Sequence, residues 1–369
     1  MKKLLPALLL ALLLLPHGLR AQERLLIVSD LHFTADSSAS RSVTDAIVRL
    51  AADYDALLVL GDCANSGRPE EHAQVRAFLE QAASETGAAV YVLPGNHDLS
   101  GGFSPADFAA YYDGFGYRRS FSRDPSGAGY AAWTEGGTCL VMLDVNHYDG
   151  TVKAALHGAV REETLRWLRH LLPSLPPGTR TVVAGHYPLL PFSGSGSDDT
   201  ENAAALAEVL REYSLPLYLC GHRHSNYTLH TDTLRQIAVG VPFSYPAWAG
   251  SLTPLTDGWD YQVVPIYTEG SPENERMAND SLTLARRMAS GSLAGTRYEG
   301  DLEAEDWFLR VFTANMTVSL NDCRQALLED ENCQKWRDAD VRSAVKPWIL
   351  SLLENPQEDV RHVVVRTAQ

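Results

Sequence analysis

Residues 25–32 read Leu-Leu-Ile-Val-Ser-Asp-Leu-His, so four apolar residues are followed at once by a polar segment that contains Asp30 and His32. A short apolar run of this kind is typical of a buried β-strand. Side chains alternate along an extended chain, so Asp30 and His32, two positions apart, point to the same side. The segment therefore predicts a buried strand that ends in a pair of potential metal ligands.

Later apolar runs end in the same way, in most cases with a glycine and then a potential ligand. The run at residues 56–60 is followed by Gly61-Asp62, and the run at 89–93 by Pro94-Gly95-Asn96-His97-Asp98. The run at 181–184 is followed by Gly185-His186, and the run at 217–219 by Gly221-His222-Arg223-His224. In open α/β folds, ligands bind beyond the carboxyl ends of the strands. We therefore expect these side chains to converge on one site although they are far apart in sequence.

Helical patterns alternate with the predicted strands, to which residues 140–143 add one more. Apolar residues recur at helical spacing in residues 43–54, 71–83, 162–172 and 203–213. This alternation predicts an α/β fold with helices covering a sheet. By itself, the pattern does not distinguish a β-sandwich from one doubly wound sheet.

The potential ligands form a chemically coherent set. Carboxylate and imidazole together suit Zn, Fe or Mn, and the residues do not decide among these ions. Seven ligands are too many for one tetrahedral ion, but they suit two ions that share a carboxylate, a known device for displacement at phosphorus. The predicted metal ligands are Asp30, His32, Asp62, Asn96, His186, His222 and His224.

The order of the five motifs resembles the calcineurin-like metallophosphoesterase superfamily, over roughly residues 24–245. The resemblance implies a four-layer fold, a β-sandwich flanked by α-helices, and two divalent or trivalent metal ions. It assigns Asp30, His32 and His224 to the first metal, Asp62 to the bridge, and Asn96, His186 and His222 to the second metal. The implied reaction is hydrolysis of a phosphodiester or phosphomonoester by a metal-bridging hydroxide.

The resemblance also implies catalytic residues and a branch of the superfamily. His97, oriented by Asp98, is expected to protonate the leaving group. Purple acid phosphatases carry a tyrosine ligand just after the bridging aspartate, and residues 61–67 contain no tyrosine. The chain therefore resembles the bacterial class III phosphodiesterase branch. Two alternatives stay open: a pyrophosphatase for nucleotide-sugar or lipid diphosphates, and a non-catalytic phosphate-binding module.

The ends of the chain differ from this central part. Residues 1–21, with Lys2, Lys3 and an apolar run from Leu4 to Leu15, predict a signal peptide, with an uncleaved anchor as the alternative. We expect a secreted or periplasmic protein with a catalytic domain at 22–269 and a mainly helical extension of unknown role at 270–369. No other membrane span is expected. The formal net charge of −15 argues against a broad nucleic-acid surface, and the small phosphate ester is the expected partner.

Some residues outside the motifs have open assignments. Cys323 and Cys333 could form a disulfide in an oxidising compartment or stay free. We expect a solvent-exposed loop at Arg118, Arg119 and Arg123. The alternative is that these arginines bind a substrate phosphate. Phe243, Tyr245 and Trp248 follow the last ligand pair closely enough to reach the mouth of the site. Five histidines without such context are assigned to structural or surface roles: His72, His147, His157, His170 and His230.

Overall fold

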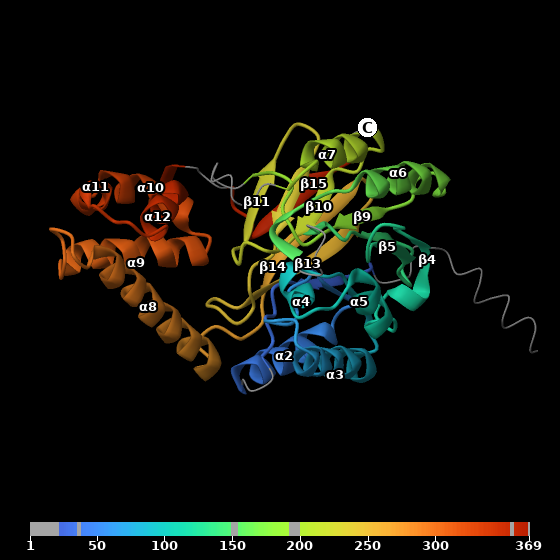
Figure 1. The fold of residues 1–369 in the computed structure, drawn as a ribbon, viewed down its shortest axis with the longest axis horizontal. Coiled ribbons are helices and arrows are strands. Elements are labelled where there is room, and N and C mark those ends of the chain that lie inside the picture. The colour runs from blue at the N-terminus through green and yellow to red at the C-terminus, as the bar shows by residue number, and fades with distance from the viewer. Residues whose placement is uncertain (1–21, 35–37, 149–153, 192–199, 355–357, 368–369) are drawn as a thin grey trace, which may run out of the picture.

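The computed structural model describes residues 22–34, 38–148, 154–191, 200–354 and 358–367, so the predicted signal peptide lies outside the described residues. Two large β-sheets occupy the centre of this part (Figure 1). The first sheet has the order β15-β14-β13-β1-β2-β3, formed by His362–Arg366, Gly258–Pro265, Trp248–Leu255, Leu25–Val28, Ala56–Val59 and Ala89–Val92. β1, β2 and β3 are parallel, so their carboxyl ends meet at one edge.

The second sheet has seven strands in the order β11-β12-β10-β9-β6-β5-β4. They span Tyr227–His230, Arg235–Ala238, Leu217–Cys220, Thr181–Ala184, Cys139–Met142, Tyr130–Trp133 and Ser120–Arg123. β9 pairs in parallel with both β10 and β6. The carboxyl ends of β9 and β10 therefore also lie side by side.

Side-chain alternation in the second sheet separates two apolar cores. In β9, Val182 lies in the core that contains the first sheet, whereas Val183 lies in the core on the other face. Leu219 and Tyr218 of β10 are divided in the same way. A sheet that is buried on both faces needs a covering layer on each. The two stacked sheets confirm the predicted β-sandwich.

Helices cover the outer faces of both sheets (Figure 1). α2 (Ser38–Ala51) and α3 (Pro69–Thr86) share a core with the first sheet, and α6 (Glu162–Leu171) and α7 (Ala203–Glu212) share one with the second. This arrangement confirms the flanking helices of the expected fold. The shorter elements are α4 (Asn96–Ser100), α5 (Pro105–Tyr111), the 3-10 turns η2 (Tyr117–Arg119) and η3 (Leu172–Ser174), and the hairpin of β7 (Asn146–Tyr148) and β8 (Ala154–Gly158).

A separate group of helices lies to one side of the sheets in Figure 1 and confirms the mainly helical extension. It comprises α8 (Pro272–Leu293), α9 (Leu302–Met316), α10 (Leu320–Glu329), α11 (Glu331–Asp338) and α12 (Val345–Glu354). These helices enclose a core of their own that includes Trp307, Phe308 and Trp336. The chain then returns to the first sheet, where β15 pairs with β14 and buries Val363 and Val365. The domain boundary near residue 270 stays a prediction.

The structure also bears on the cysteines and on membrane insertion. All five cysteines are free thiols, so Cys323 of α10 and Cys333 of α11 do not form a disulfide. Within the described ranges, none of the helices is long and apolar enough to cross a membrane.

Candidate metal centre

The predicted ligands lie where parallel strands of both sheets end. β1 is followed by Asp30 and His32, β2 by Asp62, and β3 by Asn96. In the second sheet, β9 is followed by His186, and β10 by His222 and His224. β1–β3 belong to one sheet and β9–β10 to the other. The structure therefore brings together ligands from both halves of the sandwich, as the sequence predicts.

Most of these ligands have an unusual backbone conformation. Left-handed φ angles occur at Asp30 (54°), His32 (40°), Asp62 (48°), His222 (69°) and His224 (54°). A non-glycine residue in this region costs about 1–3 kcal/mol and persists only where the surroundings fix it. Here the main chain supplies that restraint, because Asp30 N–H donates to Gly61 O at 3.0 Å and His32 N–H to Asp62 O at 2.8 Å. Such strain in five residues of one cluster is typical of a functional site.

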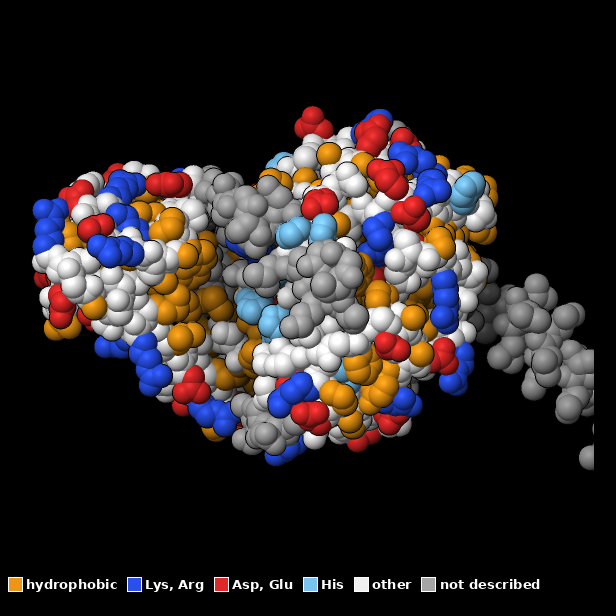
Figure 2. All heavy atoms as spheres, in the orientation of Figure 1, with side chains coloured by type: hydrophobic (Ala, Val, Ile, Leu, Met, Phe, Trp, Pro, Cys, Tyr) orange, Lys and Arg blue, Asp and Glu red, His pale blue; other side chains and the backbone are white. Residues whose placement is uncertain are grey.

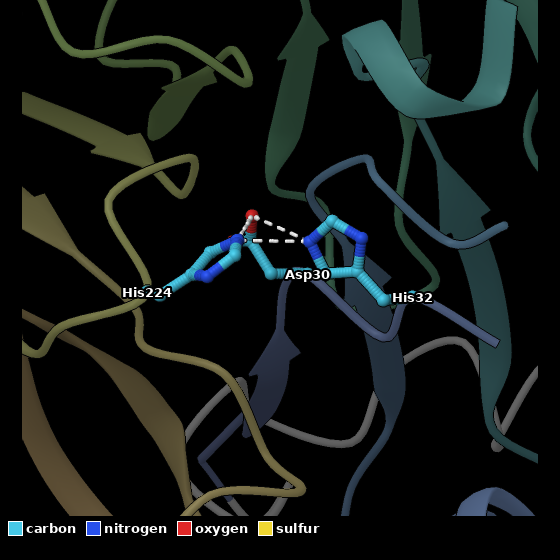
Figure 3. Close-up of side chains that lie close together, drawn as sticks. All are labelled: Asp30, His32 and His224. Carbon is cyan, nitrogen blue, oxygen red and sulfur yellow. Dashed lines mark hydrogen bonds and ion pairs between the residues drawn. The ribbon is translucent and has the colours of Figure 1, made fainter. Parts of the chain in front are cut away.

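The first cluster consists of Asp30, His32 and His224, whose side chains point toward one another (Figure 3). The Nε2 atoms of His32 and His224 are 2.8 Å apart, and His224 Nε2 lies 3.5 Å from Asp30 Oδ1. Burial lowers the pKa of His32 to about 4, although the carboxylates of Asp62 and Asp30 act to raise it. His32 is therefore neutral near pH 7, which is the form that binds a metal ion. Histidine side chains reach the surface near the middle of the face in Figure 2, and half of the His224 side chain is exposed.

The second cluster consists of Asp62, His186 and His222. The fully buried His186 donates from Nδ1 to Leu60 O at 2.9 Å, which directs Nε2 to within 3.2 Å of Asp62 Oδ2. Burial acts to lower the pKa of His186, but Asp62 outweighs it and raises the pKa to about 9. The carboxylate thus favours a positive charge at this place, either a proton or a metal ion. Burial, and then His186, lowers the pKa of His222 to about 4.

Two buried atoms of this region fit a metal ion. Within the described residues, Asn96 Oδ1 has no hydrogen-bond partner, and His186 Nε2 makes no well-aligned hydrogen bond although Asp62 Oδ2 lies 3.2 Å away. Leaving a buried polar atom unpaired costs about 1–3 kcal/mol, so such atoms in a native fold call for an explanation. An oxygen and an imidazole nitrogen are both suitable ligands for Zn, Mn or Fe. The donor set therefore fits the metal pair that the sequence predicts.

Asp62 lies between the two clusters. Its Oδ2 is 3.8 Å from His32 Nε2 and 3.2 Å from His186 Nε2. Burial acts to raise the pKa of Asp62, but the neighbouring His186 outweighs burial and holds the pKa well below its usual range. Asp62 is thus an anion that faces both clusters, which is the position expected of a bridging ligand.

Gly95 allows the loops after β2 and β3 to approach each other closely. A Cβ at position 95 would lie 2.2 Å from Asp62 Oδ1 and 2.4 Å from Asp62 N. Real side chains do not approach so closely, so any larger residue would displace Asp62. The glycine before Asn96 is thus required by contact with the neighbouring loop.

His97 lies beside the clusters, as expected for a residue that faces the substrate. Its ring and that of His32 are 4.5 Å apart, edge to face. His97 Nδ1 donates to Asn65 O at 2.5 Å, so Nε2 is the nitrogen that can exchange a proton in the site. The structure places His97 in one ligand group with His32 and Asp62.

The expectation that Asp98 orients the ring of His97 is wrong. The buried Asp98 carboxylate accepts from Ala64 N–H at 2.8 Å and from Gly95 N–H at 2.9 Å, whereas Asn65 O fixes the ring of His97. Burial, and then the neighbouring Asp62 carboxylate, raises the pKa of Asp98 to about 7. Residues 97 and 98 are consecutive in α4, and helical geometry directs adjacent side chains apart. Asp98 therefore ties the two ligand-bearing loops together.

Two aromatic residues lie against the ligands. The ring of Tyr187 is 4.3 Å from that of His222, and the ring of Phe243 is 6.1 Å from that of His32. Phe243 thus reaches the site as predicted, whereas Tyr245 and Trp248 line a different cavity beside Thr317. Tyr187 is not predicted from the sequence, where its one signal is that it directly follows His186.

The arginines at positions 118, 119 and 123 do not join the ligand clusters. Arg118 Nε lies 2.7 Å from Asp113, and Arg119 and Arg123 lie 3.8 Å from Glu135 and Asp113. Arg118 and Arg123 line a cavity of about 1030 Å³ formed mainly by α3, α5 and residues 113–129. The lining of this cavity is mixed, because charged side chains such as Arg76 and Asp113 lie beside alanines and the aromatic rings of Phe115 and Tyr117, so the pyrophosphatase alternative stays open.

A β-sandwich that gathers carboxylate, amide and imidazole ligands at the ends of its parallel strands defines a metal-dependent phosphoesterase. The chain belongs to the calcineurin-like phosphoesterase family, whose profile matches residues 23–226. It is therefore a hydrolase of phosphate esters, and its Asp and His clusters are consistent with the dinuclear metal site that the family uses.

Relatives with similar sequences include proteins described as phosphodiesterases. A probable cyclic nucleotide phosphodiesterase of Rhodococcus erythropolis is 28% identical over 220 residues, which cover 57% of this chain and 67% of the relative. A glycerophosphodiester phosphodiesterase of Enterobacter lignolyticus is 28% identical over 218 residues, covering 54% and 69%. A dimetal phosphatase from Danio rerio shares the fold with a TM-score of 0.53 at 15% identity, over 67% of this chain and 98% of that protein.

Proposed function

We propose that the chain hydrolyses phosphodiesters at two metal ions that share Asp62. The observation that carries the proposal is that Asp62 Oδ2 faces His32 on one side and His186 on the other. The proposed ligands of the first ion are Asp30, His32 and His224, and those of the second are Asn96, His186 and His222. Bound there, a metal pair supplies positive charge for the phosphoryl oxygens and makes hydroxide available near neutral pH.

His97 is the proposed acid. When an oxygen from water attacks phosphorus, the bond to the leaving oxygen breaks and that oxygen needs a proton. Asn65 O holds the proton on Nδ1 of His97, so protonation of the ring occurs at Nε2, which then donates to the leaving oxygen. His97 N–H also donates to Asp62 Oδ1 at 2.8 Å, which fixes the histidine relative to the bridging carboxylate.

A diester is the proposed substrate class because two relatives are described as diesterases of cyclic nucleotides and of glycerophosphodiesters. The test is an assay of the metal-loaded protein with a phosphomonoester, a linear diester, a 3′,5′-cyclic nucleotide and a dinucleotide diphosphate. We expect the largest kcat/KM with one of the two diesters. A larger value for the dinucleotide diphosphate would favour the pyrophosphatase alternative, and no turnover of any member would contradict the proposal.

The metal ions and the cellular location are also proposals. Imidazole and carboxylate ligands favour Zn, Mn or Fe, and metal analysis of protein from its native host would identify the pair. The apolar run that follows Lys2 and Lys3 favours export. Amino-terminal sequencing of protein from a periplasmic fraction should begin near residue 22. Recovery only in the cytoplasm with Met1 or Lys2 at the amino terminus would exclude export.

A further inference from the structure

A second group of potential metal ligands lies outside the site described above. His147 of β7, His157 of β8 and Glu201, which precedes α7, each present one ligand atom, and these atoms lie within 4.8 Å of one another. The rings of His147 and His157 are 4.6 Å apart. Nothing in the sequence near either histidine resembles a ligand motif, so the sequence alone predicts structural or surface roles for both.

The two distances from Glu201 to the histidines fit a shared metal ion better than they fit direct hydrogen bonds. Glu201 Oε1 lies 3.4 Å from His147 Nδ1 and 3.5 Å from His157 Nε2. Hydrogen bonds between nitrogen and oxygen are commonly 2.7–3.2 Å long. On a tetrahedral ion with bonds of about 2.1 Å, two ligand atoms are about 3.4 Å apart. The same spacing occurs at the main site, where His224 Nε2 lies 3.5 Å from Asp30 Oδ1.

Hydrogen bonds of the backbone and of neighbouring side chains hold Glu201 and His147 in place. Glu201 N–H donates to Gly158 O at 2.9 Å, and Val160 N–H donates to Glu201 O at 2.9 Å. Glu201 is thereby anchored beside β8. His147 is fixed by its neighbours, because Asn146 Nδ2 donates to Pro94 O at 3.1 Å and Tyr148 OH donates to Asp144. Side chains alternate along a strand, so His147 points away from these buried contacts.

We propose that His147, His157 and Glu201 bind a single Zn²⁺ ion, separate from the predicted metal pair. Two imidazoles and one carboxylate are an established ligand set for zinc, and three protein ligands leave a fourth position for water. The side chains are 25%, 42% and 56% exposed, so this fourth position is open to solvent.

The ion joins three chain segments next to the main site. It links both strands of the β7–β8 hairpin to the segment that leads into α7. β8 packs against α4, the helix that carries Asn96 and His97. Zinc at this place therefore steadies the hairpin beside the proposed acid without contributing a ligand to the pair.

The test is the zinc content of wild type and three variants after equilibrium dialysis at low micromolar free Zn²⁺. We expect His157→Ala and Glu201→Gln each to retain one zinc ion fewer per chain than wild type. His230→Ala is the matched control, because His230 Nδ1 also lies near a surface carboxylate, 2.7 Å from Glu358, but belongs to no three-ligand group in the described part of the chain. It should keep the wild-type zinc content.

A second measurement covers the case in which a variant loses structure. Amide hydrogen exchange of wild-type residues 146–148 and 157–158 should slow when zinc is added, and the slowing should be absent in Glu201→Gln. Equal zinc content in wild type, His157→Ala and Glu201→Gln, or no slowing in wild type, would overturn the proposal. All the proposed ligands of the pair are intact in these variants, so this result is independent of whether the main site works as proposed.

Discussion

The backbone N–H of His97 donates to Asp62 Oδ1 at 2.8 Å, so the proposed acid and the bridging carboxylate are directly connected. This bond occupies one carboxylate oxygen and leaves Oδ2 to face His32 and His186. Oδ2 is therefore the oxygen through which Asp62 would hold a metal ion.

Asp62→Asn should remove the bridge and largely preserve the fold. The amide oxygen of asparagine can still accept from His97 N–H, but the NH₂ group that replaces Oδ2 cannot bind a metal ion. We expect metal content to fall and kcat/KM to drop by more than about 100-fold. Loss of a residue that only hydrogen-bonds to a metal ligand costs up to about 100-fold, and loss of a ligand itself should cost more. Metal analysis and initial rates check this. The exposed Asp232→Asn is the control, and unchanged metal content in Asp62→Asn would remove the bridging role.

His97→Ala should reduce turnover by about 10²- to 10⁴-fold while leaving metal content nearly unchanged, because the side chain is assigned to proton donation. The loss should be small for a diester with a 4-nitrophenolate leaving group, which needs no proton, and large for an alkyl leaving group. Rates with both substrates, with the exposed His170→Ala as control, check this. Equal losses for the two leaving groups would contradict the role as acid.

Asp98→Asn should destabilise the protein. An asparagine offers only one acceptor oxygen, so either Ala64 N–H or Gly95 N–H loses its partner. We expect the free energy of unfolding to fall by about 1–3 kcal/mol, measured by urea denaturation. Because Asp98 does not orient His97, the dependence of rate on the leaving group should stay as in wild type. A selective loss with the alkyl leaving group would restore the role first assigned to Asp98.

His72 should make stability depend on pH. Its buried ring bonds to Tyr112 OH and Asp98 O, and burial lowers its pKa below the usual value. As pH falls below about 6.5, the unfolded chain takes up a proton that the folded chain does not, so stability decreases by up to about 1.4 kcal/mol per pH unit. His72→Gln should show a shallower decline between pH 7 and pH 5 in urea denaturation with chelator present. Parallel curves for the two proteins would show that this ring does not contribute.

The strands and ligands that could be predicted from the sequence are those with local signals. β1, β2, β3, β9 and β10 are buried on both faces, so each is a continuous apolar run, and each ends in a motif within a few residues. β14 and β15 are not among the predicted strands: β14 mixes buried and exposed residues, and the apolar run of β15 is only three residues long. They pair across the whole helical segment, and no short window of sequence records that contact.

The site residues also divide into those with a local sequence signal and those that only the fold brings together. Asp30 and His32 are close together in the sequence. His147 and Glu201 come together only because the chain at the end of β8 pairs with the segment before α7. The role of Asp98 was predicted wrongly, since adjacency to His97 in sequence suggested a contact that the helical turn of α4 prevents. The left-handed conformation of the ligand residues could not be predicted either, because aspartate and histidine are enriched in that conformation but only a small fraction of them adopt it.

The return of β15 to the first sheet determines how the helices α8–α12 can be removed. Cutting the chain near residue 270 would strip β14 of its neighbour and leave an unpaired apolar edge, which promotes aggregation. Gln262 of β14 lies opposite His362 of β15, so the two strands run as a hairpin whose connection happens to contain the helices. The helices thus stand between two paired strands of one sheet, so an excision has to keep β15 as well as Met277 of α8, which is buried in the core of the first sheet.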